Sequence, residues 1–546
     1  MTEEHVPVLV VGAGTVGLST AVALTRHGVR PLVVERRDGT LIHPRATGLH
    51  PPAREFFRAV GVADRIAQVC ADLAPSMTKI SVSPSLAAAD LSTVDRVPTP
   101  PLDVVADTLR LSPTTVGPCA QDQIDIVLAE AAVAAGARIR FAAKVCGLHQ
   151  DDDGVTVRLV DPTTGRGDTV RARYVVGADG ASSRVRRELG VRMPLEDDLA
   201  NPMIHILFRA DLADLVRGHE FNFCEVWHPD HEGLLLSIDN KTRWVFHRSY
   251  DAARESPEDY PEQRCAELVR GAVGIPDLDV TIEAIMPWRI SGGCAERMRR
   301  GRVFLAGDSA HVVPPVGGFG MTTGISDAYN LAWKLGMVLD GHAGPGLLDT
   351  YEEERLPVAR FACEQGLNRL RAMMLTWDPR PEEEKERERA GLRIAAPLVT
   401  SMGYDYRSAA VVGARTGSPS IEDVEANLDG SPGSRVPHAW VERAGERVST
   451  LDFAGTGFAL IAGQAAGDWA AASEKAAAAT GIPLTAHRAG VDFTDPGGAF
   501  ATAAGIGPAG ALLVRPDNFV AWRSTGPHPE PDAHLHDVLH TLMQRG

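Results

Sequence analysis

Short apolar runs alternate with helical patterns in the first part of the chain. Residues 8–11 (VLVV) form a continuous apolar run, which is typical of a strand buried on both faces. Apolar positions then recur at helical spacing over 18–25, and a second apolar strand is expected at 31–34. This strand–helix–strand order predicts an α/β domain at the N-terminus.

A different pattern, with period-2 or fully apolar strands, fills the middle of the chain. Strands are expected in MIHILFRA (203–210), LLLSID (234–239) and RWVFHR (243–248). We expect residues of about 76–104 and 191–285 to fold into a separate mixed sheet.

The C-terminal part returns to alternating strands and helices. Residues 350–374 have the pattern of an amphipathic helix, and the charged stretch 379–393 is expected to be a solvated helix face or a linker. After a linker at 401–436, strands are expected in STLDF, GFALIAG, PLTAHRAG and ALLVRPDNFVAWR, separated by Ala-rich helices such as DWAAASEKAAAATG. This alternation over 437–546 predicts a small α/β domain.

Length and charge limit the classes of protein that the chain fits. A chain of 546 residues is too long for one hydrophobic core, so two or three domains are expected. The net charge of −16 argues against nucleic acid or an anionic membrane as partner, because both select a basic face. The start MTEEHVPVLVVGAG does not resemble a signal peptide, and no apolar run reaches the roughly 18 residues that span a bilayer. We therefore expect a cytoplasmic protein.

The cysteines show no functional spacing. Seven of them are scattered over positions 70, 119, 146, 224, 265, 294 and 363, with no CxxC and no metal-ligand pattern. Such a dispersed, odd-numbered set is expected to consist of reduced core thiols, and no metal site is expected.

A glycine-rich motif follows the first strand. Gly12, Gly14 and Gly17 form G-x-G-x-x-G, and Glu35 ends the second strand 18 residues after Gly17. In such a motif the first glycine permits a tight turn, the second lets the backbone approach a pyrophosphate, and the third lets helix and strand pack closely. The acid at the strand end accepts hydrogen bonds from a ribose. The motif predicts a Rossmann-like dinucleotide site but does not distinguish NAD from FAD.

Two further strand-and-glycine motifs lie far down the chain. ARYVVGADGASSRVRRELG (172–190) has a strand, a GADG turn containing Asp179, and a basic helix. GRVFLAGDSAHVVPPVGGFGMTTGISDAYNLAWKL (301–335) has a strand, Asp308 in a turn, a Gly-rich loop and a long helix. By itself Asp308 fits a capping residue at a strand-to-turn corner. It fits equally an acceptor for the ribityl chain of a flavin.

Together the three motifs resemble the single-component FAD-dependent aromatic hydroxylases, the superfamily of 4-hydroxybenzoate and phenol hydroxylases. Their order and spacing match that superfamily over about residues 6–360. Phe319 and Thr322 differ from the residues that many members have beside the flavin. Thr47 replaces an Asp of the phenol-hydroxylase subgroup, so the chain resembles the polyketide- and alkaloid-tailoring monooxygenases more.

The C-terminal segment carries its own resemblance. Its LVRPDxxVAWR ending is similar to the thioredoxin-like C-terminal domain of these enzymes. Residues 437–546 contain no cysteine, which excludes thioredoxin chemistry. We expect the domain to pack on the FAD domain or on a second copy of the chain, so a homo-oligomer is left open.

The resemblance implies a division into domains and a reaction. A discontinuous FAD-binding domain is expected from 1–75, 105–190 and 286–400, and a substrate domain from 76–104 and 191–285. The implied enzyme takes electrons from NADPH or NADH, which binds transiently, and reacts with O₂. A flavin C4a-hydroperoxide then hydroxylates an aromatic or polycyclic small molecule, in secondary-metabolite or antibiotic biosynthesis.

The resemblance also implies site residues. Arg45 would lie beside the flavin and is the one candidate for a catalytic group, Gln121 would lie near the ribityl phosphate, and Asp179 between flavin and nicotinamide. The expected FAD-binding residues are Gly12, Gly14, Thr15, Val16, Gly17, Glu35, Arg36, Arg45, Gln121, Asp179, Gly180, Gly307, Asp308, Pro315, Gly318, Gly320, Met321 and Thr322. The candidate substrate-pocket residues are Phe221, Phe223, Trp227, His228, His247 and Trp288.

Alternatives remain open at this point. The same scaffold supports Baeyer–Villiger or epoxidising chemistry on a polyketide. A ligand-carrying protein that is not an enzyme is a second alternative, which the complete set of glycine and acidic residues disfavours. A flavin disulfide reductase is a third, and it lacks the required cysteine pair.

Overall fold

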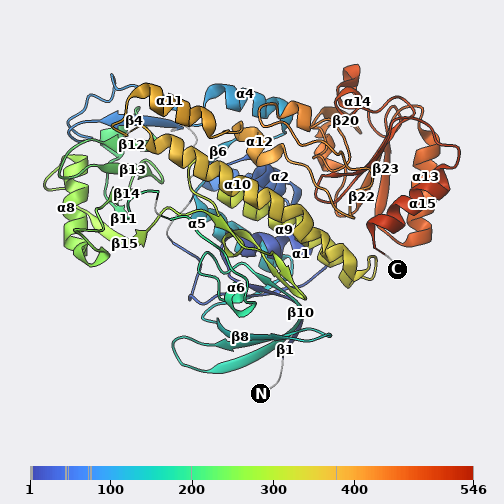
Figure 1. The fold of residues 1–546 in the computed structure, drawn as a ribbon, viewed down its shortest axis with the longest axis horizontal. Coiled ribbons are helices and arrows are strands. Elements are labelled where there is room, and N and C mark those ends of the chain that lie inside the picture. The colour runs from blue at the N-terminus through green and yellow to red at the C-terminus, as the bar shows by residue number, and fades with distance from the viewer. Residues whose placement is uncertain are drawn as a thin grey trace.

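The structure is a computed structural model, and it describes residues 4–42, 46, 48–71, 73, 77–197, 199–376 and 378–544. Figure 1 shows three parts: a central α/β domain, a second sheet next to helix α8 at the left, and a C-terminal domain in orange and red at the right. Two long helices, α9 (Phe319–Leu339) and α10 (Thr350–Met374), run between these parts. Among the described residues, no helix is long and apolar enough to cross a bilayer.

The central domain is built on a mainly parallel sheet. Its strand order is β17-β18-β10-β1-β2-β7, and the antiparallel strands β9 and β8 extend it from β10. The strands are β1 (Glu4–Val11), β2 (Leu32–Val34), β7 (Arg138–Arg140), β8 (Lys144–Gln150), β9 (Val155–Val160), β10 (Gly167–Gly177), β17 (Arg299–Arg300) and β18 (Val303–Leu305). The other helices are α1 (Thr15–Arg26), α2 (Pro51–Ala59), α3 (Ala63–Val69), α4 (Leu102–Leu111), α5 (Gln121–Ala134) and α6 (Arg184–Glu188).

The register of this sheet brings the three sequence motifs to one edge. Val11 at the end of β1 lies opposite Gly177 at the end of β10, and Gly177 lies opposite Leu305 at the end of β18. Each motif begins directly after one of these strand ends. Ligands of open α/β sheets bind at the carboxyl ends of the strands, so this edge is where a dinucleotide site is expected.

The second sheet has strands from both segments that the sequence assigned to it. Its order is β15-β11-β14-β13-β12-β4-β5, and only the pairing of β4 with β12 is parallel. The strands are β4 (Thr78–Val82), β5 (Val97–Pro98), β11 (Met203–Arg209), β12 (Phe223–Val226), β13 (Gly233–Ser237), β14 (Arg243–Ser249) and β15 (Thr281–Trp288). Helix α8 (Glu262–Val273) covers one face, where Trp244, Phe246 and Cys265 share a buried cluster. The three predicted strands are confirmed.

The C-terminal domain has the strand order of a thioredoxin fold, β23-β22-β24-β25, in which only β22 and β23 are parallel. Its main elements are β22 (Phe458–Ala462), α13 (Gly467–Thr480), β23 (Leu484–Arg488), α14 (Ala499–Ala503), β24 (Ala511–Val514), β25 (Val520–Ser524) and α15 (Pro531–Leu542). The predicted strand in STLDF is wrong. Ser449 caps the turn by accepting a hydrogen bond from the Leu451 N–H, and this segment forms a 3₁₀ turn, Thr450–Asp452, after the short hairpin β20 (Trp440–Arg443) and β21 (Glu446–Ser449).

Residues 401–436, expected as a linker, pack closely between the domains. Tyr406 is buried and stacks on Phe519 with ring centroids 4.0 Å apart, and its hydroxyl accepts a hydrogen bond from Arg355 of α10 (2.9 Å). The charged stretch forms an exposed helix, α11 (Glu382–Gly391), followed by α12 (Pro397–Met402).

A buried ion-pair cluster fastens the C-terminal domain to α9 and α10. Glu354 of α10 pairs with Lys334 of α9 (2.7 Å) and with Arg515 (2.6 Å), and Arg515 pairs with Asp517 (2.6 Å). The side chains of Lys334, Glu354 and Arg515 are fully buried. The LVRPD segment therefore docks onto the two long helices through charges that have no access to water.

Candidate active site

The start of α1 has the geometry of a phosphate-binding helix end. Gly12 has a φ of +108°, and a Cβ there would lie 2.3 Å from the Ala178 carbonyl oxygen. A Cβ at Gly17 would lie 1.9 Å from the Gly12 carbonyl oxygen, whereas nothing lies within 4 Å of a Cβ at Gly14. The helix also has no side-chain cap. Its first N–H groups therefore face an open space, which suits an anionic group.

Glu35 lies at the end of β2 beside this helix start. It is 7% exposed, and its carboxylate accepts hydrogen bonds from the N–H groups of Ala13 (3.0 Å) and Arg37 (3.1 Å). These contacts fix the carboxylate next to the glycine turn. The neighbouring Arg36 is exposed.

Gln121 connects the same helix start to the segment around residue 46. Its amide donates to the Thr15 hydroxyl (3.2 Å) and accepts from the Ala46 N–H (3.0 Å), while Thr15 donates to Asp125 (2.5 Å). Arg45 and Thr47, which flank Ala46, lie outside the described residues. Gln121 thus lies beside the start of α1.

The third motif closes over the first turn of α1. Gly307 has a φ of +60°, and Val16 packs where its Cβ would be, at 2.8 Å. Val16 also fills the space beside Gly324 of α9, since a Cβ there would lie 2.6 Å from Val16 Cγ2. Asp308 follows Gly307 in a 3₁₀ turn and is half-buried. The starts of α1 and of the Asp308 turn are therefore neighbours.

Asp179 has a clear structural role. Its carboxylate accepts hydrogen bonds from the Ser183 hydroxyl (2.5 Å), the Arg184 N–H (2.7 Å) and the Val185 N–H (3.1 Å), and so caps α6. Arg186 donates to the Ser309 carbonyl oxygen (2.8 Å), which joins α6 to the third motif. A Cβ at Gly180 would meet nothing within 4 Å. These contacts explain the conformation of the GADG turn without a ligand.

His50, a residue that sequence analysis missed, contacts the glycine loop that precedes α9. The His50 ring contacts the Gly317 carbonyl oxygen through Nε2 (2.7 Å) and stacks on Phe319, and its backbone N–H donates to the Thr322 hydroxyl (3.2 Å). Burial lowers the pKa of His50, and the Gly317 carbonyl contact opposes that shift only in part. Neutral His50 therefore donates through Nε2 to Gly317.

This support leaves the N-terminus of α9 uncovered. Gly318, with a φ of +71°, is the residue before the helix and donates its N–H to the Pro315 carbonyl oxygen (3.0 Å). No side chain caps α9, and Gly318 and Pro315 are exposed, while Gly320 and Met321 are half-buried. The uncapped helix end carries a positive partial charge at the surface of the site. The helix starts at Phe319.

Beneath the third motif lies a fully buried charge cluster that no sequence pattern indicated. Asp327 of α9 accepts from the Gly307 N–H (2.9 Å) and from Arg355 (2.8 Å), and contacts His311 Nε2 (2.6 Å). Burial by itself raises the pKa of Asp327, but the charges of His311 and Arg355 outweigh it and hold that pKa below its usual value. The ionised carboxylate thereby fixes the backbone turn that carries Asp308.

The face of the second sheet that α8 does not cover is turned toward the central domain. Arg243, on that face of β14, forms an ion pair with Asp122 of α5 and donates to the Ile42 carbonyl oxygen (2.8 Å). Val245 and His247 follow Arg243 on the same face, because side chains alternate along a strand. Strands β11 and β15 add further side chains to this face through the register of the sheet.

These residues form an aromatic wall. The rings of His205 and His247 stack with centroids 3.7 Å apart and planes 6° from parallel, and Trp288 packs against His205 at 4.6 Å. Phe223 lies farther along the same face, next to Leu236. Phe223, His247 and Trp288 are only half-buried although their face is turned inward, which indicates open space beside them. We call His205, Phe223, His247 and Trp288 the aromatic wall.

Three of the sequence candidates lie elsewhere. Trp227 is 47% exposed at the end of β12, and His228 stacks on His231, which lies beside Gly271 of α8. Phe221 is fully buried in the cluster under α8. Sequence analysis did not select His205, whose place in the alternating run of β11 becomes informative only when its partner His247 is known.

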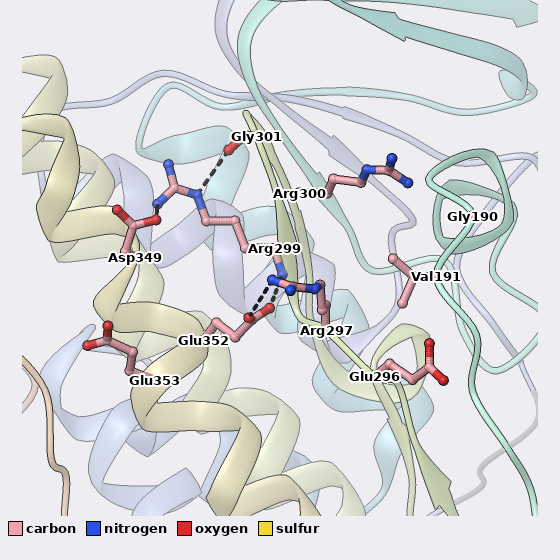
Figure 2. A pocket seen from close by; sticks show the side chains of 10 residues that line it. All are labelled: Gly190, Val191, Glu296, Arg297, Arg299, Arg300, Gly301, Asp349, Glu352 and Glu353. Carbon is pink, nitrogen blue, oxygen red and sulfur yellow. Dashed lines mark hydrogen bonds and ion pairs between the residues drawn. The ribbon is translucent and has the colours of Figure 1, made fainter.

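A surface cleft of about 730 Å³ lies apart from these features (Figure 2). It is lined by residues next to α6, by β17 and by the start of α10, and Arg299 and Arg297 turn to Asp349 (2.5 Å) and Glu352 (3.6 Å). Only Gly190 and Gly301, the end residues of the second and third motif stretches, line it, and the two cations Arg297 and Arg299 are already paired. It is not the site that the motifs define.

The uncapped starts of α1 and α9, the acid at the end of β2 and the turn bearing Asp308 thus lie near the carboxyl ends of one mainly parallel sheet. The open space at Gly14 fits a pyrophosphate, and Glu35 fits a ribose hydroxyl. Among the described residues, no group of three or more side chains is arranged to hold a metal ion. This fold and site define a dinucleotide-binding protein with a second, mixed sheet.

Comparison with known proteins gives the family. The FAD binding domain family matches residues 5–365, and the family of aromatic-ring hydroxylase C-terminal domains matches residues 429–545. The chain belongs to the FAD-dependent aromatic-ring hydroxylases. It is an enzyme that uses FAD, as the resemblance implied.

Three relatives illustrate the match. The chain is 40% identical to tetracenomycin A2 monooxygenase-dioxygenase of Streptomyces glaucescens over 566 aligned residues, covering 100% of this chain and 98% of the relative. It is 38% identical to aklavinone 12-hydroxylase of Streptomyces purpurascens, covering 100% of both chains. The crystal structure of aklavinone-11 hydroxylase in a ternary complex with FAD and aklavinone superposes with a TM-score of 0.85, at 35% identity and with 100% of both chains covered.

Proposed function

We propose that this enzyme hydroxylates a polycyclic aromatic polyketide, with NADPH or NADH as electron donor and O₂ as oxygen source. The observation that carries the proposal is the aromatic wall. Phe223, His247 and Trp288 are half-buried on the inward face of the sheet, and the rings of His205 and His247 stack on each other beside Trp288. Partly open aromatic side chains bind aromatic ring systems through offset-stacked or edge-to-face contacts.

We propose residue roles on the cofactor side as well. The N–H groups at the start of α1 would bind the FAD pyrophosphate, Glu35 the ribose, and Asp308 the ribityl chain. The uncapped end of α9 would direct its positive partial charge at the isoalloxazine, where it favours an anionic reduced ring. Bound FAD, once reduced, supplies the activation of O₂ that transfers one oxygen atom to the substrate and releases the other as water.

The chain's own residues then have positioning tasks. The aromatic wall would hold the substrate ring edge-on to the flavin site and exclude water from it. His50, by holding the loop at Gly317, would keep the backbone in front of α9 close to the flavin. No acid–base pair is needed to explain the oxygen transfer, so none is assigned.

Relatives supply the probes for a test. Tetracenomycin A2, tetracenomycin B2 and aklavinone appear in the names of similar enzymes, and we call these three compounds the polyketide panel. At least one of them should accelerate NAD(P)H oxidation by the FAD-loaded enzyme and gain a hydroxyl group. A product with a ring-expanded lactone would instead show Baeyer–Villiger chemistry and overturn the proposal.

The wall itself is tested with a matched pair of variants. Trp288→Ala should raise the KM for the accepted compound about 2- to 13-fold, since one aromatic pair contributes about 0.5–1.5 kcal/mol. Trp227→Ala is the control, because Trp227 is exposed and lies outside the wall. Equal effects of the two substitutions would contradict the assignment of the wall.

A further inference from the structure

Two cysteines that are far apart in the sequence meet beside the third motif. Cys294 lies on the short strand β16 (Gly293–Cys294), and Cys363 lies on α10. Their sulfur atoms are 3.0 Å apart, and both are free thiols. The sequence predicted reduced thiols, and both cysteines are free thiols here, but their positions along the chain did not indicate that these two meet.

The surroundings of the pair favour reaction at Cys294. The pKa of Cys294 is lowered mainly by the Cys363 thiol beside it. The charges of His311 and Arg360 lower it further, and partial burial opposes the shift only in part. The pKa of Cys363 is raised by the same contact and by burial. Cys294 is half-buried, while Cys363 is 4% exposed. A half-buried thiol with a lowered pKa, in contact with a second thiol, is the arrangement of a peroxide-sensitive cysteine with its resolving partner.

The pair also lies close to the loop that precedes α9. β16 pairs with β19 (His311–Val312), and Cys294 lies directly opposite His311. Cys363 is one turn of α10 before Gly366, where a Cβ would lie 2.9 Å from Pro314. A covalent bond between the sulfur atoms would therefore tie α10 to the strand pair from which the glycine loop emerges.

We propose that Cys294 and Cys363 form a modification site, a dithiol that hydrogen peroxide oxidises to an intramolecular disulfide. The Cys294 thiolate attacks one peroxide oxygen, the O–O bond breaks, and Cys294 becomes a sulfenic acid as hydroxide leaves and takes up a proton. Cys363 then attacks the Cys294 sulfur, and its proton leaves with the displaced oxygen as a second water. The two thiols lose two electrons and two protons in total, and one H₂O₂ becomes two H₂O.

The oxidant has a local source. A flavin enzyme that reduces O₂ without transferring oxygen to a substrate releases hydrogen peroxide, and this part rests on the proposed function. The oxidation of the two thiols does not depend on the proposed function, since added hydrogen peroxide oxidises them equally well.

The chain offers an internal control in Cys70 and Cys119. Both are buried and lie near each other, but no contact between their sulfur atoms is present among the described interactions. Burial raises the pKa of each. They should remain reduced at peroxide concentrations that oxidise the proposed pair.

The test is peptide mapping of the FAD-loaded enzyme after treatment with added hydrogen peroxide, with free thiols alkylated before digestion. Trypsin places the two cysteines in separate peptides, ISGGCAER (290–297) and FACEQGLNR (361–369). We expect these two peptides to become joined by a disulfide that dithiothreitol reverses, and the free-thiol count of the denatured protein to fall by two. Cys294→Ser and Cys363→Ser should each abolish the joined peptide, with retained flavin absorbance reporting that the variant is folded.

Other outcomes overturn the proposal. They are a sulfinic or sulfonic acid at Cys294 without any joined peptide, a bond between two copies of the chain, or equal oxidation of Cys70 and Cys119. Because the hydrogen peroxide is added, the disulfide test does not depend on hydroxylation. A negative disulfide result does not contradict the proposed hydroxylation, and an enzyme that hydroxylates none of the probes can still be tested for the disulfide.

Discussion

Removing the Arg515 guanidinium should loosen the C-terminal domain more than any surface substitution in that domain. Arg515 donates to both oxygens of Glu354 (2.6 and 2.8 Å) and to both oxygens of Asp517 (2.9 and 2.6 Å). Arg515→Met has a similar length and no charge. It leaves two buried carboxylates facing one cation, Lys334.

The size of the effect follows from that imbalance. Burial by itself raises the pKa of Glu354, and the charges of Arg515 and Lys334 outweigh it and hold that pKa well below its usual value. Breaking a buried ion pair by removing one partner typically costs about 3–5 kcal/mol, because an uncompensated charge is left in the interior. We expect Arg515→Met to lower the free energy of unfolding by this amount.

The assay is urea unfolding followed by tryptophan fluorescence, since Trp333 lies 5.1 Å from the Arg515 guanidinium and is fully buried. Lys475→Met is the control. It removes an ion pair with Asp532 in the same domain, but both side chains are at least half exposed, and such pairs contribute at most about 1 kcal/mol. A shift for Arg515→Met no larger than that for Lys475→Met would refute the docking role of the cluster.

Two further predictions concern the cofactor site. Gly14→Ala should fold like the wild-type protein yet retain little FAD, because its methyl group enters only the open space proposed for the pyrophosphate. Gly17→Ala should instead destabilise the fold, because its Cβ would lie 1.9 Å from the Gly12 carbonyl oxygen. Thermal unfolding and flavin absorbance after gel filtration separate the two effects, and full FAD occupancy in Gly14→Ala would contradict the assignment. The pKa of His50 in the folded protein is held below its ordinary 6.5, so on acidification His50 takes up a proton in the unfolded chain at a higher pH than in the folded protein. The stabilisation by neutral His50 is therefore complete above pH 6.5 and is lost as the pH falls below it. The wild-type protein should therefore lose FAD as the pH falls below 6.5. His50→Gln, whose amide can still donate to Gly317 but does not titrate, should lose less FAD over the same pH range. Identical pH profiles of FAD retention for the two proteins would count against the role of His50.

Elements with a strong local pattern were predictable from the sequence. The valine-rich β1, the glycine turn and α1 follow one another without interruption, and Glu35 lies where the spacing placed it. The helix α10 was also predicted with its observed bounds, although Pro357 lies inside it. In these segments the local preference of the chain and its burial in the fold agree.

Features set by long-range pairing were not predictable. The aromatic wall requires the register that puts His205 opposite His247, and the contact of His228 with His231 likewise depends on the folded chain. The cysteine contact joins residues 69 positions apart. Hydrophobic periodicity gives the two faces of a strand but not which neighbour each face meets.

Glycines illustrate the same division. Sequence spacing marked Gly12 as the site of a tight turn and Gly17 as a site of close packing, in agreement with the φ of +108° at Gly12 and the 1.9 Å from a Cβ at Gly17 to the Gly12 carbonyl oxygen. It also marked Asp179 as a cofactor neighbour, and the structure gives that carboxylate three hydrogen bonds within its own turn. A capping residue and a ligand-binding residue have the same sequence signature at a strand-to-helix turn.

The most direct test of the account is a single turnover with labelled oxygen. The FAD-loaded enzyme is reduced with NADPH or NADH without oxygen, mixed with the accepted member of the polyketide panel, and then exposed to ¹⁸O₂ in unlabelled water. The account predicts a hydroxylated aromatic product that carries one ¹⁸O atom for each flavin oxidised, as read by mass spectrometry. A product without the label, or flavin reoxidation that leaves every member of the panel unchanged and yields only hydrogen peroxide, would contradict it.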